Sequence, residues 1–386
     1  MKRYGAARVR TLLLALVALV TAAAAPAQVP AVSSQLPEWL APGALFAVSG
    51  FAGARAPVAL VSDGAVLAQT TSGRFGKFVL RAHAPAPGRH RLTVRTGGKI
   101  VAVGTLTTRE LTIAAVGDVT PGEQVGPAVS AFGGDYPWGE AGPVLAAADI
   151  ATANLEGVVS SRGAPVPDKR YHLRGPRAVL QGAAGAGGLD VLTLANNHTG
   201  DYGDAALLDT LVAAHGAGLE TVGAGANLAA AHRPVVVESG GLRVAFLGYS
   251  DVNPLGFPAT ATSPGTARAE GIGEDVRRAR LSADVVVCWF HWGIELHAEP
   301  NARQRALAGL ALAAGAQIVL GAHPHVFGRI DRPRPHALVA WTLGNFVFPA
   351  GSGASTRSGI LIVRVNARGA AGYRVVGARA GVRPSL

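Results

Sequence analysis

The stretch LTIAAVGDV, residues 111–119, is a run of apolar and β-branched residues that ends in an aspartate. Such a run predicts a buried strand over 111–116, with Asp118 just beyond its carboxyl end. Similar runs predict further strands at 150–155, 191–194, 235–238, 244–249, 285–290, 318–321, 337–343 and 360–365. Helical patterns lie between them at 144–148, 205–215, 274–280 and 301–314. This alternation predicts an α/β fold, in which helices cover both faces of buried sheet.

Polar side chains that can bind metal ions or take part in catalysis follow these predicted strands. In chain order they are Asp118, Glu156, Asn196, Asn197, His198, His291, His323, His325 and Asn345. In open α/β folds ligands bind outside the carboxyl ends of strands, so we expect these side chains to meet at one rim. Each residue alone could be a turn or cap residue, but so many at strand ends favour one shared site.

Carboxylates, amides and imidazoles without cysteine form a ligand set of nitrogen and oxygen atoms. Such a set suits a divalent ion such as Mn²⁺, Fe²⁺ or Zn²⁺. Two ions about 3.5–4 Å apart could hold the attacking and leaving oxygens of a phosphoester displacement. The sequence therefore predicts a centre for one or two divalent ions.

Residues 41–109 have a different pattern, with short β-branched runs separated by Gly, Pro, Ser and Asp. This spacing predicts a small all-β sandwich of the immunoglobulin-like kind. No cluster of titratable residues accompanies it, so we expect a spacer or a binding module. The larger α/β domain is expected over 110–376 and a short polar tail over 377–386.

The first residues resemble a targeting segment. Four cations, at Lys2, Arg3, Arg8 and Arg10, precede a short apolar run and an Ala-rich exit. This order predicts a signal peptide over 1–27, followed by a linker over 28–40, and hence a secreted or cell-surface protein. An uncleaved anchor is the alternative, although the run is shorter than the ~20 residues that a spanning helix needs.

Composition excludes several classes of protein. Hydrophobic residues make up 49% of the 386 residues and charged ones 15%, which excludes intrinsic disorder. The single cysteine excludes a disulfide framework. Without the four N-terminal cations, 31 basic residues face 24 acidic ones, a net charge of +7. No block of basic residues appears, so we expect no nucleic-acid partner.

Taken together, the strand-end motifs resemble the CapA family of poly-γ-glutamate capsule biosynthesis proteins, which have a calcineurin-like metallophosphatase fold. The motifs, in order, are GDV (117–119), NLEG (154–157), LANNH (194–198) with DYG (201–203), HWG (291–293) with Glu295, GAHPHV (321–326) and LGNFVF (343–348). The resemblance runs from about residue 111 to residue 365 and implies two packed sheets flanked by helices. It does not cover the β-sandwich.

The resemblance also implies roles for the residues. Asp118 and His325 would bind a first ion, Glu156 would bridge, and Asn197, His291 and His323 would bind a second. His198, with Asn197, would be catalytic, His198 protonating a leaving oxygen or donating to a substrate oxyanion. Asn196, Asn345 and Trp292 would contact substrate, although Trp292 could equally be core.

One departure from metallophosphatases concerns the first ligand motif. They begin Asp-x-His, whereas here Thr120 stands two residues after Asp118. One imidazole is therefore missing, and the sequence leaves a single-metal and a binuclear site equally open. The family implies a metal-dependent hydrolase or transferase; a non-catalytic factor for polymer binding and export, or an extracytoplasmic phosphoesterase, are the alternatives.

A basic segment over 169–174 lies between two of the strand ends. We expect Lys169 and Arg174 to bind carboxylate or phosphate groups, the alternative being an ordinary solvated charge run. The implied partners are an acidic extracellular polymer or a small anionic substrate, together with membrane proteins of capsule synthesis and export.

Overall fold

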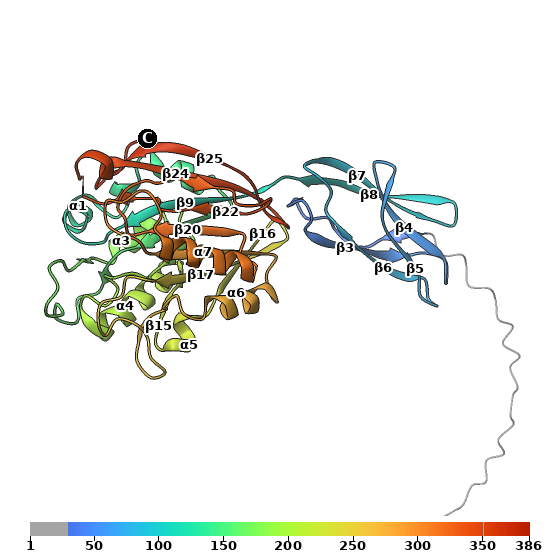
Figure 1. Ribbon diagram of the computed structural model, residues 1–386. Coiled ribbons are helices and arrows are strands. Elements are labelled where there is room, and N and C mark those ends of the chain that lie inside the picture. The colour runs from blue at the N-terminus through green and yellow to red at the C-terminus, as the bar shows by residue number, and fades with distance from the viewer. Residues whose placement is uncertain (1–29, 350) are drawn as a thin grey trace, which may run out of the picture.

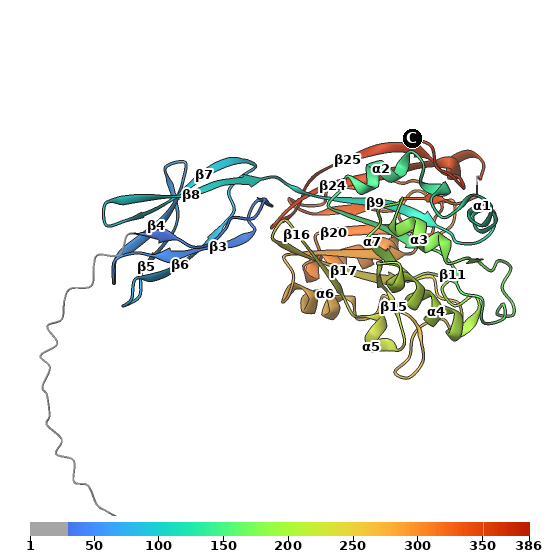
Figure 2. The same cartoon turned by 180° about the vertical axis from the view of Figure 1, so that it is seen from behind.

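A computed structural model of the protein describes residues 30–349 and 351–386 and shows two lobes (Figures 1 and 2). The smaller lobe is a sandwich of two sheets. One sheet has the order β1-β3-β6 and the other β2-β8-β7-β4-β5. The strands are β1 (Ala31–Val32), β2 (Trp39–Leu40), β3 (Leu45–Phe51), β4 (Pro57–Ser62), β5 (Ala65–Thr71), β6 (Lys77–His83), β7 (Gly88–Thr96) and β8 (Lys99–Thr108). The predicted all-β sandwich is confirmed.

Alternation of side chains explains why this lobe is a sandwich. Along β6 the side chains of Phe78, Leu80 and Ala82 are buried, while the residues between them are exposed. A period of two places one set of side chains in the core and the other in solvent. The expected linker over 28–40 is wrong from residue 31 onward, because β1 pairs with β3 and β2 pairs with β8. The expected signal peptide lies outside the described residues.

The larger lobe contains two sheets with mostly parallel strands. The first has the order β14-β13-β10-β9-β24-β25, and β23 also pairs with β9. The second has the order β16-β17-β19-β20-β22-β21. Their strands are β9 (Leu111–Val119), β10 (Ile150–Leu155), β13 (Val191–Thr193), β14 (Glu220–Val222), β16 (Val235–Ser239), β17 (Leu242–Ser250), β19 (Val285–His291), β20 (Ile318–Ala322), β21 (Ile330–Asp331), β22 (Leu338–Ala340), β23 (Asn345–Val347), β24 (Arg357–Asn366) and β25 (Gly369–Arg379).

The two sheets pack face to face, and helices cover their outer faces. Ile113 of β9 and Phe246 of β17 belong to the same buried cluster between the sheets. The first sheet is covered by α1 (Val125–Phe132), α2 (Ala141–Ala146), α3 (Ala178–Ala184) and α4 (Gly203–Gly216), and the second by α6 (Ile272–Arg280) and α7 (Ala302–Ala314). The α/β fold with two packed sheets flanked by helices is therefore confirmed (Figure 1).

Short elements complete the larger lobe. They are β11 (Val158–Val159), β12 (Arg174–Gly175), β15 (Ala224–Gly225), α5 (Leu228–Ala231), β18 (Gly265–Thr266) and two 3₁₀ turns, Tyr136–Trp138 and Gly353–Thr356. No helix of the described residues is long and apolar enough to cross a membrane.

Helix α7 shows how local sequence sets an element's ends. The side chain of Asn301 accepts a hydrogen bond from the backbone of Gln304, whose own side chain accepts from the backbone of Asn301. This capping box satisfies amide groups at the start of the helix. At the other end Gly315 has a φ of 116°, a left-handed geometry that glycine adopts without strain.

The end of the chain differs from expectation. β25 extends to Arg379, and Val347 and Gly381 form a further bridge, so residues 377–381 pack against the first sheet rather than forming a polar tail. Ala380 is buried there. The expected end of the domain at residue 376 is wrong, because this strand mixes exposed and buried residues and lacks a continuous apolar run.

The two lobes meet at a continuous core. Ala41 donates a backbone hydrogen bond to Gly240 O, and Ala367 donates to Pro42 O. The guanidinium of Arg109 lies 3.5 Å from the centre of the Trp39 ring and forms two hydrogen bonds to Asp149. The lobes are therefore held by backbone, cation–π and charged contacts together.

Candidate functional site

The end of β9 sets one wall of the site. A Cβ atom at Gly117 would lie only 1.8 Å from Gly344 O, so glycine is required for this close approach. Asp118 N donates to that same carbonyl oxygen at 2.8 Å. As a result, Asp118 and Asn345 lie side by side on β9 and β23. The packing of two glycines thus brings a carboxylate and an amide to one rim.

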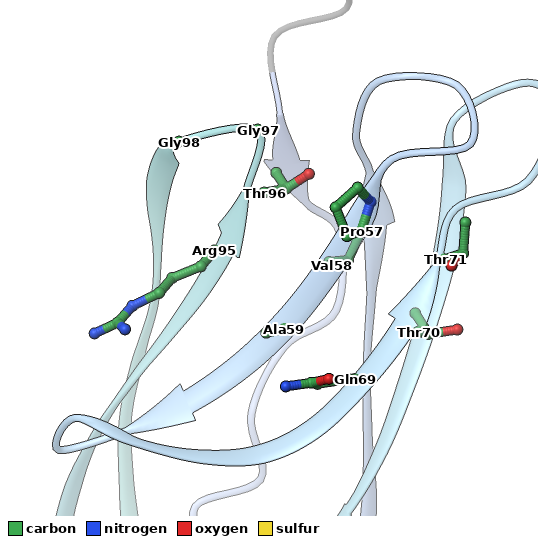
Figure 3. Close-up of a pocket in the computed structure, with 10 residues that line it drawn as sticks. All are labelled: Pro57, Val58, Ala59, Gln69, Thr70, Thr71, Arg95, Thr96, Gly97 and Gly98. Carbon is green, nitrogen blue, oxygen red and sulfur yellow. The ribbon is translucent and has the colours of Figure 1, made fainter.

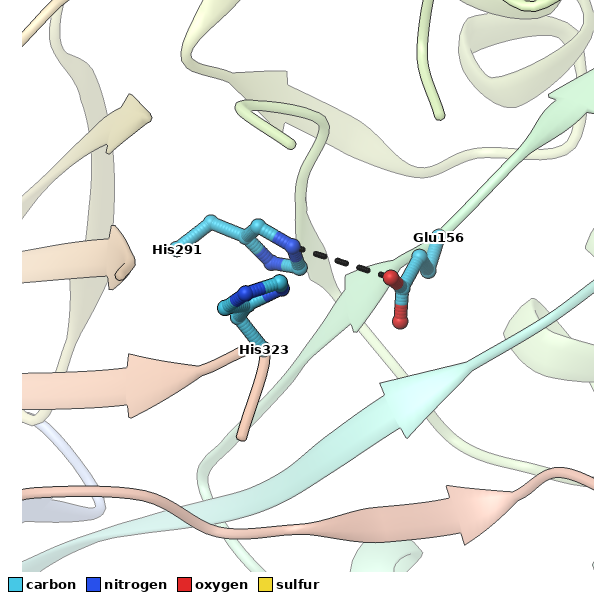
Figure 4. A group of neighbouring side chains, drawn as sticks. All are labelled: Glu156, His291 and His323. Atoms are coloured by element: carbon cyan, nitrogen blue, oxygen red, sulfur yellow. Dashed lines mark ion pairs between the residues drawn. The ribbon is translucent and has the colours of Figure 1, made fainter. Parts of the chain in front are cut away.

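Glu156 lies directly after β10 at the centre of the site. Its side chain is fully buried, and neither carboxylate oxygen has a hydrogen-bond partner among residues 30–349 and 351–386. Burial, with the nearby charge of Asp118, raises the pKa of Glu156 to about 8. Oε1 lies 3.6 Å from Nε2 of His291 (Figure 4). A buried carboxylate without a donor is costly, so this group has the character of a cation ligand.

Two groups of potential metal ligands share Glu156. One contains Glu156, His291 and His323, and the other contains Asp118, Glu156 and His325. The ligand atoms within each group lie within 4.8 Å of one another. This is the grouping that the resemblance implied, with Glu156 common to both. A third group joins His323 and His325 to Glu295, whose side chain is exposed.

Burial leaves two of the imidazoles without charge. It lowers the pKa of His323 to about 4, and the pKa of His291 well below its usual range. Neutral imidazole is the form that binds a metal. Burial also opposes protonation of His325, but Glu156 and Asp118 outweigh it and raise the pKa of His325 to about 10. The raised pKa of His325 thus reflects the two acidic groups beside it.

The backbone holds two of these histidines in strained geometry. His323 has a φ of 94° and His325 a φ of 58°. Left-handed backbone is unfavourable for a residue with a side chain and persists where the surroundings enforce it, often at functional sites. Nδ1 of His323 is buried, and no described residue forms a hydrogen bond with it. The loop after β20 therefore has a strained backbone at His323, and it carries an imidazole nitrogen without a hydrogen-bond partner among the described residues.

Sequence reasoning missed the role of Asn154. Its Nδ2 donates to Asp118 Oδ1 at 2.8 Å, and its Oδ1 accepts from Nδ2 of Asn196 at 3.1 Å. Asn154 therefore orients the carboxylate of Asp118. The signal was present, because Asn154 and Glu156 are two residues apart and side chains at that spacing share one side of a strand.

His198 is oriented by an aspartate three residues later. Nδ1 of His198 donates to Asp201 Oδ2 at 2.7 Å, and the opposite ring atom, Nε2, lies 4.0 Å from Glu156 Oε1. Burial lowers the pKa of His198, while Asp201 partly opposes this. The imidazole is therefore fixed with Nε2 toward the ligand groups, as the expected catalytic role requires.

Asn197 lies beside a metal-ligand candidate. Its Oδ1 accepts a hydrogen bond from Nε2 of His291 at 2.7 Å. The two residues expected on the same ion are thus adjacent, although they come from different sheets.

Lys169 reaches the site, but its charge is already engaged. Its ammonium forms an ion pair with Asp201 and donates to the backbone oxygen of Asn197. Burial lowers the pKa of Lys169, and the carboxylate of Asp201 partly opposes this. Lys169 therefore positions the loop of His198, and its ammonium is not free to bind an anion.

Arg174 does not reach the ligand groups. Its guanidinium donates to the backbone oxygens of Arg162 and Gly163 and lies 3.4 Å from the centre of the Tyr202 ring. The expectation that Arg174 binds substrate is therefore corrected: its side chain instead joins two surface segments.

Of the two roles left open for Trp292, substrate contact and core packing, its burial supports core packing. Its side chain is fully buried, its ring stacks on Phe290 with centres 4.3 Å apart, and Nε1 donates to Trp341 O. It belongs to the core under α7, and no surface remains for a substrate. The side chain after His291 on β19 points to the opposite face of the sheet, which explains this burial.

The two remaining amides organise the site rather than face a substrate. Asn196 is fully buried, and its Oδ1 accepts from the backbone N of His198 and from Thr199 Oγ1. Asn345 is also buried, and its Oδ1 accepts from Nδ1 of His325 at 2.8 Å. The expectation that Asn196 contacts substrate is corrected, since both polar atoms of its amide form hydrogen bonds within the protein.

The donor set fits a divalent ion. Asp118, Glu156, Asn197, His291, His323 and His325 offer oxygen and nitrogen ligands without a thiolate, as Mn²⁺, Fe²⁺ or Zn²⁺ prefer. The unpartnered oxygens of Glu156 and the unpartnered nitrogen of His323 are the atoms that an ion would satisfy. Thr120 is buried, and its hydroxyl accepts from Gly122 N at 3.1 Å, so it serves a turn.

Comparison with known proteins agrees with the motifs. Residues 112–350 match the family described as "Bacterial capsule synthesis protein PGA_cap". The chain is 34% identical over 286 residues to "Capsule biosynthesis protein CapA" of Bacillus anthracis, which covers 71% of this chain and 65% of that protein. It is 34% identical over 245 residues to "PGA biosynthesis protein CapA" of Bacillus subtilis (strain 168), covering 62% of this chain and 64% of that protein.

In both relatives the match therefore spans less than two thirds of the relative's own length. Among solved structures, a phosphatase from Mycoplasma pneumoniae superposes with a TM-score of 0.46 and 14% identity, covering 70% of this chain and 94% of that chain. This likeness is too distant to support a conclusion. The match over residues 112–350, which takes in all the strand-end motifs, shows that the chain belongs to the bacterial capsule synthesis protein family PGA_cap.

Proposed function

We propose that the protein is an extracytoplasmic, metal-dependent hydrolase or transferase that acts on poly-γ-glutamate or a related capsule polymer. The observation that carries this proposal is the buried carboxylate of Glu156, which has no hydrogen-bond partner in the described part of the chain and is shared by two groups of imidazole and carboxylate ligands. The relatives named for capsule and PGA biosynthesis support the choice of polymer. The proposal includes export of the protein, with residues 1–27 removed as a signal peptide.

The chemistry follows from the residues around Glu156. A bound divalent ion would supply positive charge that polarises a carbonyl or phosphoryl oxygen and lowers the pKa of water. His198 holds its Nδ1 proton on Asp201, so Nε2 is the atom that exchanges a proton with substrate. In amide hydrolysis the carbon–nitrogen bond breaks, the carbonyl carbon gains hydroxide and the leaving nitrogen gains a proton. Nε2 of His198 is placed to take the proton that the attacking water gives up and to pass it to the leaving nitrogen.

A hollow beside the His198 loop can receive part of a substrate. It has a volume of about 660 Å³ and is lined by Lys169, Gly200 and Phe257, among others. Apolar side chains dominate its wall, and the carboxylates of Asp168 and Asp204 contribute to its lining. An acidic stretch of polymer is therefore disfavoured here, and the hollow suits a leaving or accepting group without negative charge.

Elemental analysis combined with a substrate panel tests the proposal. Protein covering residues 30–386 should contain Mn, Fe or Zn and should cleave, or transfer from, γ-glutamyl polymer. His198→Gln should retain the metal and lose turnover. A protein with no bound metal and no turnover of polymer or phosphoester would contradict the enzymatic proposal. Turnover confined to phosphoesters would identify an extracytoplasmic phosphoesterase instead.

A polymer-binding factor is the second candidate, and Thr120 favours it. The side chain two residues after Asp118 is a hydroxyl used by a turn, so the Asp118 group has one imidazole fewer than a metallophosphatase. In this role the protein would hold polymer for membrane-bound synthesis and export proteins. Tight polymer binding by metal-loaded protein, unchanged by His198→Gln and without turnover, would support this candidate.

A further inference from the structure

The net positive charge of residues 30–386 comes from the β-sandwich. Residues 30–109 contain nine Lys or Arg and two Asp or Glu, a net charge of +7. Residues 110–386 contain twenty-two of each kind, a net charge of zero. The lobe without catalytic groups therefore carries the whole charge excess. Such a segregated charge attracts an anionic partner to one part of a molecule.

The cations of the two lobes also differ in their pairing. Eight of the nine in the β-sandwich are exposed and make no ion pair with the residues that the structure describes: Arg55, Arg74, Lys77, Arg81, Arg89, Arg91, Arg95 and Lys99. In the larger lobe eight of the twenty-two Lys and Arg residues, among them Arg162, Arg303 and Arg329, form ion pairs with carboxylates of the described residues, against one of nine in the β-sandwich. The charge of the β-sandwich is thus left available to an external partner.

Strand β7 gathers three of these arginines on one face. Leu92, Val94 and Thr96 are buried in the sandwich, so the residues between them point outward. Arg89, Arg91 and Arg95 therefore share the outer face of the five-stranded sheet. We call these three residues the β7 arginine row.

A hollow lies beside the end of this row. Arg95 is paired with Ala59, and Ala59 with Gln69, on three adjacent strands (Figure 3). These residues, with Pro57, Thr71 and the hairpin glycines, line a hollow of about 500 Å³. Its side-chain groups include the amide of Gln69 and the hydroxyls of Thr70 and Thr71, which can hydrogen-bond a polar chain.

The nearest acidic side chain does not neutralise the row. Asp63 accepts hydrogen bonds from Nδ1 of His90 and from the backbone N of Arg91. These contacts hold the pKa of Asp63 below its usual range. The guanidinium groups of the row thus form no ion pair within the described part of the chain.

We infer that the β7 arginine row and its hollow bind a linear polymer of carboxylates, and that this surface, rather than the segment over 169–174, recognises the acidic polymer. Guanidinium binds carboxylate through two parallel hydrogen bonds. The strands β4, β5, β7 and β8 contain no Phe, Tyr or Trp. The fifth strand of this sheet, β2 at the edge beyond β8, contains Trp39, and the guanidinium of Arg109 already lies against that ring. The strands that carry the row and its hollow therefore lack the aromatic side chains on which nucleic-acid bases stack. The identity of the polymer as poly-γ-glutamate rests on the proposed function.

A charge-matched pair of variants tests this inference. Arg89→Gln, Arg91→Gln and Arg95→Gln are combined in one protein of residues 30–386. The control combines Arg233→Gln, Arg277→Gln and Arg374→Gln, three exposed arginines of the larger lobe without ion pairs among the described residues. Binding of fluorescent poly-γ-glutamate should weaken about tenfold or more in the first variant, and the binding should weaken with salt. The control should stay within about twofold of the parent protein.

Several outcomes would overturn the inference. If the two variants lost equal affinity for poly-γ-glutamate, overall charge rather than the β7 arginine row would explain the binding. If the first variant lost no affinity, the row would not take part in recognition. Equally tight binding of polyphosphate, or of vesicles of phosphatidylglycerol and phosphatidylcholine, would reject the carboxylate polymer as the partner. Metal content and turnover are measured on the same proteins. A parent protein that binds polymer but contains no metal and shows no turnover would contradict the enzymatic proposal and leave this inference intact.

Discussion

Asp201 accepts a hydrogen bond from Nδ1 of His198 at 2.7 Å, and the carboxylate of Asp201 is fully buried. Asp201 also accepts from the backbone N of Leu173 at 2.7 Å and pairs with Lys169. The aspartate therefore fixes the ring of His198, its tautomer and the neighbouring segment at once. Of the ring atoms of His198, this leaves Nε2 as the one directed toward Glu156.

The first prediction concerns this pair. Asp201→Asn should lower turnover by about 10²- to 10⁴-fold, because the amide cannot hold the proton on Nδ1 as the carboxylate does. Metal content should not change, since Asp201 belongs to neither group of ligands. ¹⁵N NMR of the His198 ring provides a readout independent of activity: the Nδ1–H tautomer should dominate in the parent protein and be lost in the variant. An unchanged tautomer would contradict the positioning role.

The second prediction concerns Glu156. Glu156→Gln should leave the melting temperature of the metal-free protein unchanged or higher, because burial opposes ionisation of Glu156 in the folded protein while the unfolded chain ionises it freely, and glutamine removes that cost. In the parent protein, saturating Mn²⁺ or Zn²⁺ should raise stability by about 3 kcal/mol at 100 times the dissociation constant. That increase should vanish in the variant. Calorimetry with and without metal measures both effects, and a full metal response in Glu156→Gln would reject the shared-ligand role.

The third prediction concerns pH and the junction of the lobes. Burial opposes ionisation of Asp149, but hydrogen bonds from Arg109 and Thr112 outweigh it and hold its pKa below the usual range. Because the pKa is lower in the folded state, the stabilisation is present above about pH 4 and disappears as pH falls through the folded value. Asp149→Asn should cost about 1–2 kcal/mol at pH 7, through the loss of charged hydrogen bonds.

Urea denaturation at several pH values measures this effect. The parent protein and Asp149→Asn should converge in stability as the pH is lowered below 4. Arg278→Gln is the control, since Arg278 pairs with Glu274 on an exposed helix surface and exposed pairs contribute little. A constant difference between parent and Asp149→Asn from pH 7 to pH 2 would show that the carboxylate charge is not responsible.

The fourth prediction separates core from substrate contact at Trp292. Trp292→Ala should lower the free energy of unfolding by about 3–5 kcal/mol, because it leaves a cavity beside Phe290 and Trp341. Trp292→Phe should cost less, since stacking is retained and only the hydrogen bond to Trp341 O is lost. Denaturant unfolding measures both. If Trp292→Phe kept full stability but changed the affinity for substrate, the core assignment would be wrong.

The sequence was most informative where apolar runs are continuous. β10 and β19 are buried at every position, and their predicted ranges differ from the observed ones by one residue at most. β25 and the helices α1 and α3 were missed, because β25 mixes exposed and buried residues and the two helices are short and rich in Gly and Ala. Packing against the first sheet, rather than local preference, stabilises these elements.

The site was predictable to the extent that strand ends converge. Asp118, Glu156, His291, His323 and His325 come together because parallel strands deliver their carboxyl ends to the same rim. What the sequence did not reveal is direction. Trp292 and Asn196 stand next to ligand candidates in the chain, yet one points into the core and the other toward the backbone of neighbouring loops.

The junction between the lobes has a consequence for the products of any polymer cleavage. Backbone hydrogen bonds from Ala41 to Gly240 and from Ala367 to Pro42 fix the sandwich relative to the larger lobe. A chain held on the β7 arginine row would then reach Glu156 across a constant span. Under both proposals, this fixed span would set the length of the released fragments. An enzyme whose binding domain is flexibly tethered would instead release fragments of widely varying length.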